Sequence, residues 1–335
     1  MSAPVVDTHC HIVVPEMLAG SVPGQWRPEI VREDGGQVVL FRGRRLTSVT
    51  GEFTDVEAMV GRAAEQGVDH LLLSPWIMLC PVEAGLDEAL RIGEIQNQGL
   101  ARAAAHPRVS ALAAVPLQDA AVAARELAAL MQVPGLCGAE IPASVAGACL
   151  GDDRFLPFWE AAEATGALIF VHPTTRGLPG QPALDERYLW NSVGNPLETA
   201  ITAAHLVTAG VLERYPRLRI LLAHGGGGLH AVRGRLRRAH QVRPEAAARA
   251  PAGPDASLRR LYYDSLTHDQ ALLAGLVSYA GAGQVLLGSD RPFDMGTEDP
   301  AGEVRALGLD PAEEELILGG NAARLLGLGA GPAAA

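Results

Sequence analysis

The chain alternates short apolar runs with longer segments rich in Ala, Leu, Glu and Arg, and this alternation restricts its fold more than any other feature. It is typical of repeated strand–helix units, in which helices cover parallel strands. The apolar runs predict eight strands, at 5–9, 71–74, 109–115, 138–141, 167–172, 219–223, 261–265 and 284–289. Helices are expected between them, for example at 55–66, 87–105, 120–131, 155–165 and 196–214. We therefore expect a closed (β/α)8 barrel, whose active site lies at the carboxyl ends of the strands.

Four of the predicted strands end in residue types that bind metal ions. His9 and His11 stand two positions apart, so their side chains leave a strand on the same face. His172, His224 and Asp290 end the runs of the fifth, sixth and eighth strands. Each residue alone could be a hydrogen-bonded group at the rim of the core or a turn residue. Together, on strands far apart in sequence, they predict a metal site at one end of the barrel.

The composition of the chain excludes some classes of protein. Hydrophobic residues make up 48% of the 335 residues, which is enough for a sizeable core, and the formal net charge is -11. Such an acidic chain offers no electrostatic basis for binding nucleic acid or an acidic membrane surface. The four cysteines lie far apart, which argues against a disulfide framework and favours a reducing cytoplasm. We recognise no signal peptide and no run of membrane-spanning length, so a cytoplasmic protein is expected.

One connection is too long for an ordinary strand-to-helix loop. Residues 12–54 separate the first strand from the first helix and include the basic run Arg42-Gly43-Arg44-Arg45. Long connections are usually functional or disordered. We interpret this one as a small β-rich lid over the barrel mouth, with a solvated surface insertion as the alternative. The expected organisation is one barrel domain at 1–327, with the lid at 12–54 and a flexible tail at 328–335.

Taken in order, the motifs resemble the amidohydrolase superfamily. They are HxH on the first strand, VHP on the fifth, AHGGG on the sixth and GSDxPF on the eighth. The branch that the chain resembles is typified by 2-amino-3-carboxymuconate-6-semialdehyde decarboxylase and includes aromatic-acid decarboxylases. The resemblance covers nearly the whole chain, through segments such as EQGVDHLLLSP, HPRVSALAAVPLQD and VLLGSDRPFDMG.

The resemblance implies a metal centre and an acid/base residue. His9, His11, His172 and Asp290 would bind one divalent ion, most simply Zn²⁺, with Mn²⁺ as the other choice. His224 would be the acid/base residue, and Asp290 would carry a proton as well as bind the ion.

The resemblance also implies a homodimer and a carboxylate site. Arg235 would reach the active site of a neighbouring subunit, and Arg44 or Arg45 would bind the carboxylate of a small acid from the lid. Arginines in an acidic chain are also candidate anion sites on their own account, although each could be an ordinary surface charge. Further candidates for the substrate pocket are Arg176, Trp190, His268 and Phe293.

The expected activity is non-oxidative decarboxylation of an unsaturated or aromatic carboxylic acid, such as a carboxymuconate semialdehyde or a hydroxybenzoate. The loops at 174–176 and 266–268 depart from the pattern of the family, which leaves the substrate open. A hydrolase or hydratase acting on a lactone, amide, C–C bond or enol acid could use the same residues, and only the decarboxylase would release CO2. A barrel that merely binds a small acid is disfavoured because His224 is intact.

Overall fold

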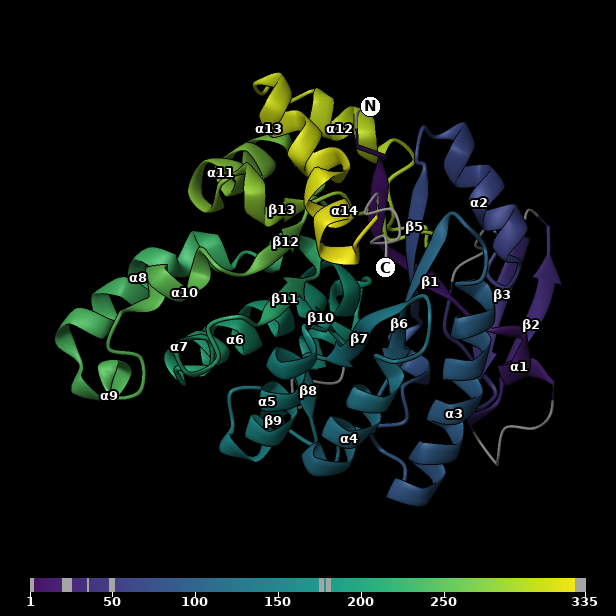
Figure 1. Cartoon of the computed structure of the whole chain (residues 1–335), viewed down its shortest axis with the longest axis horizontal. Coiled ribbons are helices and arrows are strands. Elements are labelled where there is room, and N and C mark those ends of the chain that lie inside the picture. The colour runs from purple at the N-terminus through teal and green to yellow at the C-terminus, as the bar shows by residue number, and fades with distance from the viewer. Residues whose placement is uncertain are drawn as a thin grey trace, which may run out of the picture.

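The structure is a computed structural model of the chain, and it describes residues 3–19, 26–34, 36–47, 52–174, 178 and 182–328. Within these residues, eight parallel strands follow one another around a barrel (Figure 1). In order they are β1 (Val6–Ile12), β5 (His70–Pro75), β6 (Val109–Ala114), β7 (Leu136–Pro142), β10 (Leu168–His172), β11 (Arg219–Leu222), β12 (Tyr262–Asp264) and β13 (Val285–Leu286). The predicted (β/α)8 barrel is confirmed.

Backbone hydrogen bonds close the barrel between its first and last strands. β1 pairs with β5 on one side. On its other side, the N–H of Thr8 donates to the carbonyl of Leu287 at 2.8 Å, and the N–H of Asp290 donates to the carbonyl of His9 at 2.8 Å. The residue that follows the last strand therefore lies beside the histidines of the first strand.

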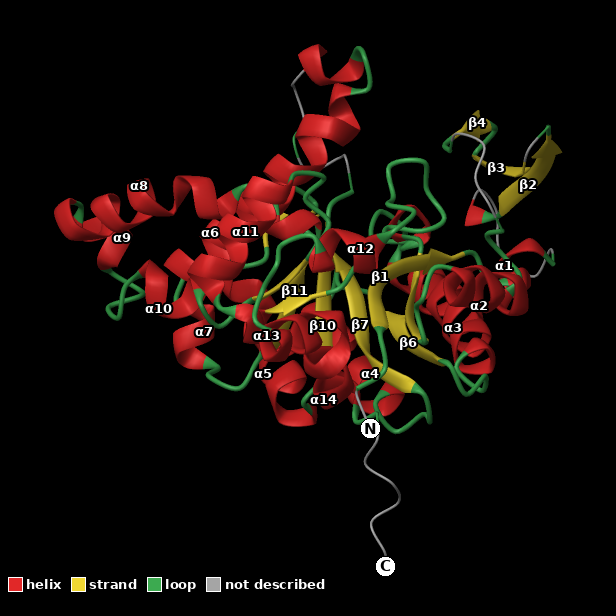
Figure 2. Ribbon diagram, turned by 90° about the horizontal axis from the view of Figure 1, so that it is seen from above, coloured by secondary structure: helices red, strands yellow, loops and turns green. Residues whose placement is uncertain are grey.

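Helices cover the outside of the barrel (Figures 1 and 2). The longer ones are α2 (Val56–Glu65), α3 (Leu86–Ala103), α4 (Ala120–Leu130), α5 (Leu156–Thr165), α6 (Asn195–Thr208), α8 (Leu229–Val242) and α11 (Gln270–Ala280). Shorter ones are α7 (Val211–Arg214), α9 (Pro244–Ala247), α10 (Pro254–Leu258), α12 (Pro300–Arg305), α13 (Pro311–Glu315) and α14 (Asn321–Leu326). Asp55 and Asp119 begin α2 and α4, because their carboxylates accept hydrogen bonds from free N–H groups of the first turn.

Several boundaries differ from the prediction by one or two residues, and three larger differences have a visible cause. The first strand extends to Ile12 rather than to residue 9, because it pairs with β5 as far as Pro75. The last strand is only Val285–Leu286 instead of 284–289, since the residues after it bond to β1 and to side chains. The helix expected at 196–214 is divided into α6 and α7, because Gly210 adopts a left-handed φ of 74° between them.

The insertion after β1 contains strands of its own. Helix α1 (Pro15–Leu18) precedes a three-stranded antiparallel sheet of β2 (Pro28–Glu33), β3 (Gly36–Phe41) and β4 (Arg44–Arg45). Figures 1 and 2 both place this sheet at one side of the barrel, near α1 and α2. That residues 12–54 act as a lid over the barrel mouth stays a prediction. A second small sheet pairs β8 (Ser144–Val145) with β9 (Ala148–Cys149).

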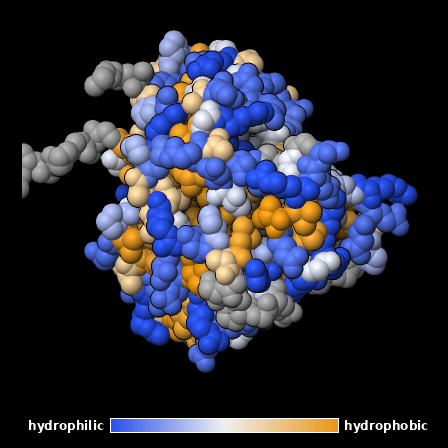
Figure 3. Space-filling model, turned by 90° about the vertical axis from the view of Figure 1, so that its right-hand side faces the viewer, coloured by the Kyte–Doolittle hydropathy of each residue, from blue (hydrophilic) through white to orange (hydrophobic). Residues whose placement is uncertain are grey.

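Apolar side chains of the barrel strands pack together up to the level of the histidines. Val6, Leu72, Leu112 and Leu221 belong to one fully buried cluster, and so does Phe170, whose ring lies 4.9 Å from that of His9. Figure 3 shows one outer side of the molecule, where hydrophilic residues surround smaller hydrophobic patches. No helix in the described ranges is both long and apolar enough to cross a membrane. Residues 329–335 of the predicted tail lie outside those ranges.

Gly138 on β7 stands where the neighbouring strand leaves no room for a side chain. A Cβ atom there would lie 1.8 Å from the backbone oxygen of Leu168, which cannot rotate away. We expect Gly138→Ala to lower the free energy of unfolding by about 1–3 kcal/mol or more. Gly61→Ala is the matched control, because nothing lies within 4 Å of its Cβ position in α2, and it should raise stability by up to about 1 kcal/mol. Urea denaturation compares the two, and an undiminished stability of Gly138→Ala would contradict the packing described.

Candidate metal centre

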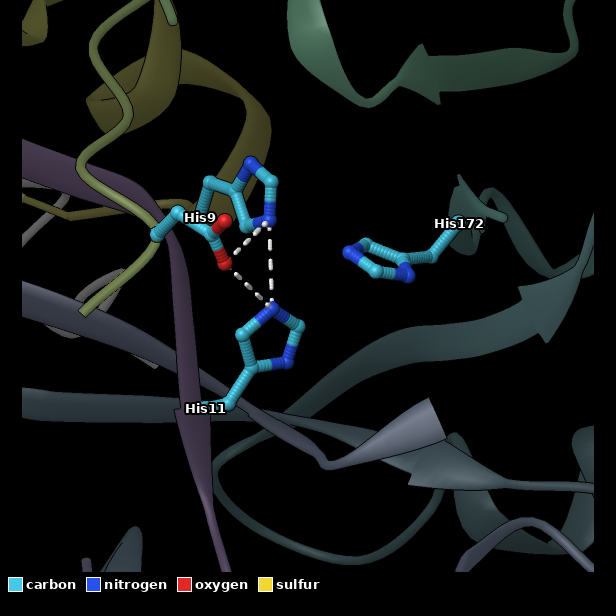
Figure 4. Close-up of side chains that lie close together, drawn as sticks. His9, His11 and His172 are labelled. Atoms are coloured by element: carbon cyan, nitrogen blue, oxygen red, sulfur yellow. Dashed lines mark hydrogen bonds and ion pairs between the residues drawn. The ribbon is translucent and has the colours of Figure 1, made fainter. Parts of the chain in front are cut away.

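Four side chains meet at the carboxyl end of the barrel, as the sequence predicts. The Nε2 atoms of His9 and His11 lie 3.1 Å apart, and Asp290 Oδ1 lies 3.3 Å from each. Figure 4 shows the rings of His9 and His11 pointing toward each other and the ring of His172 facing them. One donor atom from each of the four residues lies within 4.8 Å of the other three, and all four residues are buried.

Each imidazole is held at its Nδ1 atom, which leaves Nε2 directed at the other donors. Nδ1 of His9 lies 2.6 Å from Asp264 Oδ2, that of His11 lies 3.0 Å from Ser74 Oγ, and that of His172 lies 2.9 Å from the carbonyl oxygen of Pro173. A hydrogen bond at one ring nitrogen fixes the orientation of the ring and makes the other nitrogen a better metal ligand.

A divalent metal ion fits this set of donors. Four ligands at about 2.1 Å from one ion in tetrahedral geometry stand roughly 3.4 Å apart, close to the distances among His9, His11 and Asp290. Nε2 of His172 is buried and has no hydrogen-bond partner among the described residues. A buried polar atom without a partner is costly, and an ion at this position would satisfy it.

The charges of the cluster suit metal binding. Burial lowers the pKa of His11, and burial together with the charges of His11 and His9 holds the pKa of His172 well below its usual value. Burial also acts to lower the pKa of His9, but the charge of Asp290 and the hydrogen bond to Asp264 outweigh it and raise the pKa to about 10. Burial alone would raise the pKa of Asp290, which the charge of His9 and a hydrogen bond from His11 hold well below its usual value. These contacts therefore favour the ionised form of Asp290, and an ion bound at Nε2 of His9 would displace a proton from that atom.

His224 lies beside the cluster on a separate element. It follows β11, and its Nε2 stands 3.7 Å from Asp290 Oδ2. Its backbone N–H donates to Asp264 Oδ2 at 2.8 Å. The side chain is 16% exposed, and it lines a cavity of about 380 Å³. The ring of His224 therefore lies between the cavity and the carboxylate of Asp290.

The glycines after His224 form a fixed loop that lines the same cavity. His224 and the four residues 225–228 all have positive φ angles, between 57° and 82°. A Cβ atom on Gly227 would lie 1.9 Å from the carbonyl oxygen of Pro196. Only glycine allows this close approach to α6, which explains the run in AHGGGG.

The other pocket residues expected from the sequence differ in whether they line the cavity. His268 lines the cavity, together with Leu266, Thr267, Leu272, Met295, Asn191 and His230. Trp190 begins the π-helical turn η5 (Trp190–Gly194), and the two residues after it line the cavity. Phe293 packs against His11, with 5.4 Å between the ring centroids.

Among the described residues, three of the arginines expected to bind substrate, Arg44, Arg45 and Arg235, do not line this cavity. Arg44 and Arg45 are exposed on β4, and Arg45 forms an ion pair with Glu33 at 2.8 Å. Arg235 is exposed on α8. Arg176 lies outside the described residues.

Sequence reasoning missed three buried acidic residues near the cluster. Asp264 holds His9, and Asp7 accepts hydrogen bonds from residues on both sides of Asp290. Glu140 on β7 lies 3.8 Å from the ring of His11, and burial raises its pKa well above its usual value. Asp7 carried a signal, because it stands in the strand run that ends in His9 and His11, whereas the run that contains Asp264 ends in no proposed ligand. For Glu140 we find no such signal.

Comparisons with known proteins show what the chain is similar to. The model of the amidohydrolase family matches residues 6–328. The 2-amino-3-carboxymuconate-6-semialdehyde decarboxylase of Dictyostelium discoideum is 28% identical over 294 residues, which cover 87% of this chain and 81% of that protein. The gamma-resorcylate decarboxylase of Rhodococcus jostii is 27% identical over 248 residues, 68% of each chain.

Solved structures share the fold. A dihydroxybenzoic acid decarboxylase from a Polaromonas species, with bound manganese and the inhibitor 2-nitroresorcinol, superimposes with a TM-score of 0.78 and 24% identity. The match covers 99% of this chain and 98% of that one.

Replacing His11 tests the cluster directly. We expect His11→Ala to lose metal occupancy while keeping the fold, because the barrel core does not depend on an ion. His70→Ala is the matched control, since His70 is also a buried strand histidine bonded to a serine, Ser110, at 2.9 Å. Elemental analysis after dialysis, with circular dichroism for the fold, measures both. A fully occupied His11→Ala variant would remove His11 from the site.

Proposed function

The chain belongs to the amidohydrolase family, and on that premise we propose that it is a metal-dependent decarboxylase of an aromatic or unsaturated carboxylic acid. The observation that carries the proposal is a cluster of four side chains that could hold a metal ion, next to a cavity that Asp290 and His224 line. The decarboxylases of Dictyostelium and Rhodococcus named above support the choice of reaction.

The cavity suits a small, flat acid. Its volume of about 380 Å³ lies within the usual range for small-molecule sites. Leu266, Leu272 and Met295 give it apolar walls, and Asn191 and His268 add polar groups. Trp190 and Phe293 are proposed as further walls once a substrate is bound, and the lid arginines Arg44 and Arg45 as groups that meet its carboxylate.

We assign His9, His11, His172 and Asp290 as the ligands of the ion. Three imidazoles and one carboxylate are ligands that zinc accepts, and zinc is therefore the proposed ion. Manganese, present in the Polaromonas enzyme, is the competing choice. When bound, a divalent ion supplies a positive charge that polarises oxygen atoms of a substrate or of water.

The residues of this chain account for the movement of the proton. Loss of CO2 breaks a C–C bond and leaves an electron pair on carbon, so one proton must be added for each CO2 released. His224 is proposed to deliver that proton from its ring, since it faces the cavity and stands 3.7 Å from Asp290. Because Asp290 is ionised at rest, it is proposed to pass a proton taken from solvent water to His224 Nε2 after each turnover, which replaces the proton used with each CO2. A positioned acid of this kind typically contributes about 10²- to 10⁴-fold in rate.

The carboxylate of the substrate needs a cation that the described part of the cavity wall does not supply, because no arginine or lysine lines it there. Arg233 and Arg237 of α8 are occupied, by the ring of Tyr279 at 4.6 Å and by Asp255 at 2.6 Å. Arg235 lies between them in sequence, hence on the opposite side of the helix. α8 extends away from the barrel (Figures 1 and 2). We propose that Arg235 enters the cavity of a second subunit in a homodimer.

Release of CO2 tests the reaction and the role of His224 together. The metal-loaded chain, given a panel of carboxymuconate semialdehydes and hydroxybenzoates, should release CO2 in proportion to product. His224→Ala should keep its metal and lose about 10²- to 10⁴-fold in rate. The metal-depleted chain is the control and should be inactive. A product formed without CO2 would favour a hydrolase or hydratase, and loss of metal from His224→Ala would make His224 a ligand.

Mixing two inactive variants tests the homodimer. Arg235→Ala should raise KM or abolish turnover with metal content intact, since Arg235 is remote from the cluster. A heterodimer of Arg235→Ala with His224→Ala contains one site in which both residues are present, so activity should partly return. Two-fold symmetric dimers are the commonest oligomers. If sedimentation shows an active monomer, or if the subunits exchange and no activity returns, then Arg235 does not act in the site of a second subunit.

A further inference from the structure

Asp290 differs from the three histidines in how its backbone is held. His9, His11 and His172 lie on strands, whereas Asp290 follows β13 in a turn. Its φ is 58°, in the left-handed region. That conformation costs a residue with a side chain roughly 1–2 kcal/mol. Neighbouring groups must therefore keep the Asp290 carboxylate in its place between the histidines.

The carboxylate of Asp7 contacts both residues that flank Asp290. Asp7 Oδ1 accepts from the backbone N–H of Ser289 at 3.1 Å, and Oδ2 accepts from Ser289 Oγ at 2.5 Å and from Arg291 Nε at 2.9 Å. Oδ1 also accepts from the backbone N–H of His9 at 3.2 Å. Asp7 is completely buried. One side chain thus links the turn that carries Asp290 to the strand that carries His9 and His11.

These bonds are not required to close the barrel. Backbone hydrogen bonds already join β1 to the chain after β13, as from Thr8 to Leu287 and from Asp290 to His9. A side chain whose only role was to join these strands would add nothing to these backbone hydrogen bonds. The bonds to the side chains of Ser289 and Arg291 instead determine the path of the turn on either side of Asp290.

We propose that Asp7 is a positioning residue for the metal centre, which sets the place of the Asp290 carboxylate relative to His9 and His11. The inference rests on the metal-dependent function proposed above. Partners that orient a metal ligand from outside typically contribute 10- to 100-fold in metal affinity. By the same route, Asp7 would set the distance between Asp290 and His224, and with it the passage of the proton.

Cobalt binding provides a readout of geometry that does not depend on turnover. The Co²⁺-loaded Asp7→Asn variant should bind the ion about 10- to 100-fold more weakly and show an altered visible absorption spectrum. Loss of Asp7 also leaves Arg291 buried without its carboxylate, which can destabilise the fold. Ser289→Ala keeps that ion pair. It removes the 2.5 Å bond to Asp7 and the bonds that Ser289 Oγ accepts from the backbone N–H and Nε of Arg291, at 3.2 and 2.9 Å, so it should change the spectrum in the same direction by less.

The matched control is Asp255→Asn, which breaks a different Asp–Arg pair, with Arg237, away from the cluster. It should leave cobalt affinity and spectrum unchanged. If Asp7→Asn and Ser289→Ala bind cobalt with the wild-type affinity and spectrum, the positioning role is wrong. Should Asp7→Asn fail to fold, the spectrum of Ser289→Ala alone decides. Failure of the proposed function appears differently, as a wild-type chain that binds cobalt but releases no CO2; a wild-type chain that binds no cobalt overturns both.

Discussion

The arrangement of the site depends on the hydrogen bonds of one buried carboxylate, that of Asp264. Oδ2 lies 2.6 Å from Nδ1 of His9 and accepts the backbone N–H of His224 at 2.8 Å, while Oδ1 accepts the N–H of Gly225 at 2.7 Å. One buried group therefore orients a proposed metal ligand and holds the loop that begins with His224, the proposed acid/base residue. Asp264 ends β12, which lies between β11 and β13 in the sheet. His224 follows β11, and the chain after β13 bonds to β1, which carries His9. Strand pairing therefore brings His9 and His224 to the same carboxylate. The distance between the cluster and His224 follows from the barrel itself.

Two further features support this contact. The glycine run behind His224 lets the loop lie against the carbonyl of Pro196, which a side chain at Gly227 would prevent. The buried apolar cluster below the histidines, in which the ring of Phe170 lies 4.9 Å from that of His9, separates the site from the other end of the barrel. Rigid surroundings of this kind keep donors in place for an ion before it arrives, which favours metal binding.

The alternation of the sequence was enough to predict the barrel and the cluster, because strand-end residues on parallel strands must share one end of the barrel. It did not predict the roles of Asp7 and Asp264, since an acidic residue in a strand run can be a ligand, a cap or a hydrogen-bond acceptor. Which of these holds depends on distances between neighbouring strands that only pairing sets. The direction of an exposed arginine such as Arg45 follows from its ion pair with Glu33, twelve residues earlier in the antiparallel sheet. The sequence pattern does not encode that contact.

The central claim is that one divalent ion binds between His9, His11, His172 and Asp290. Anomalous diffraction from crystals grown with Mn²⁺ tests it most directly, because the signal locates the metal without reference to activity. The account predicts one strong peak per chain, within bonding distance of the Nε2 atom of each histidine and of an Asp290 oxygen. A peak elsewhere, or one that His172 does not contact, would contradict it.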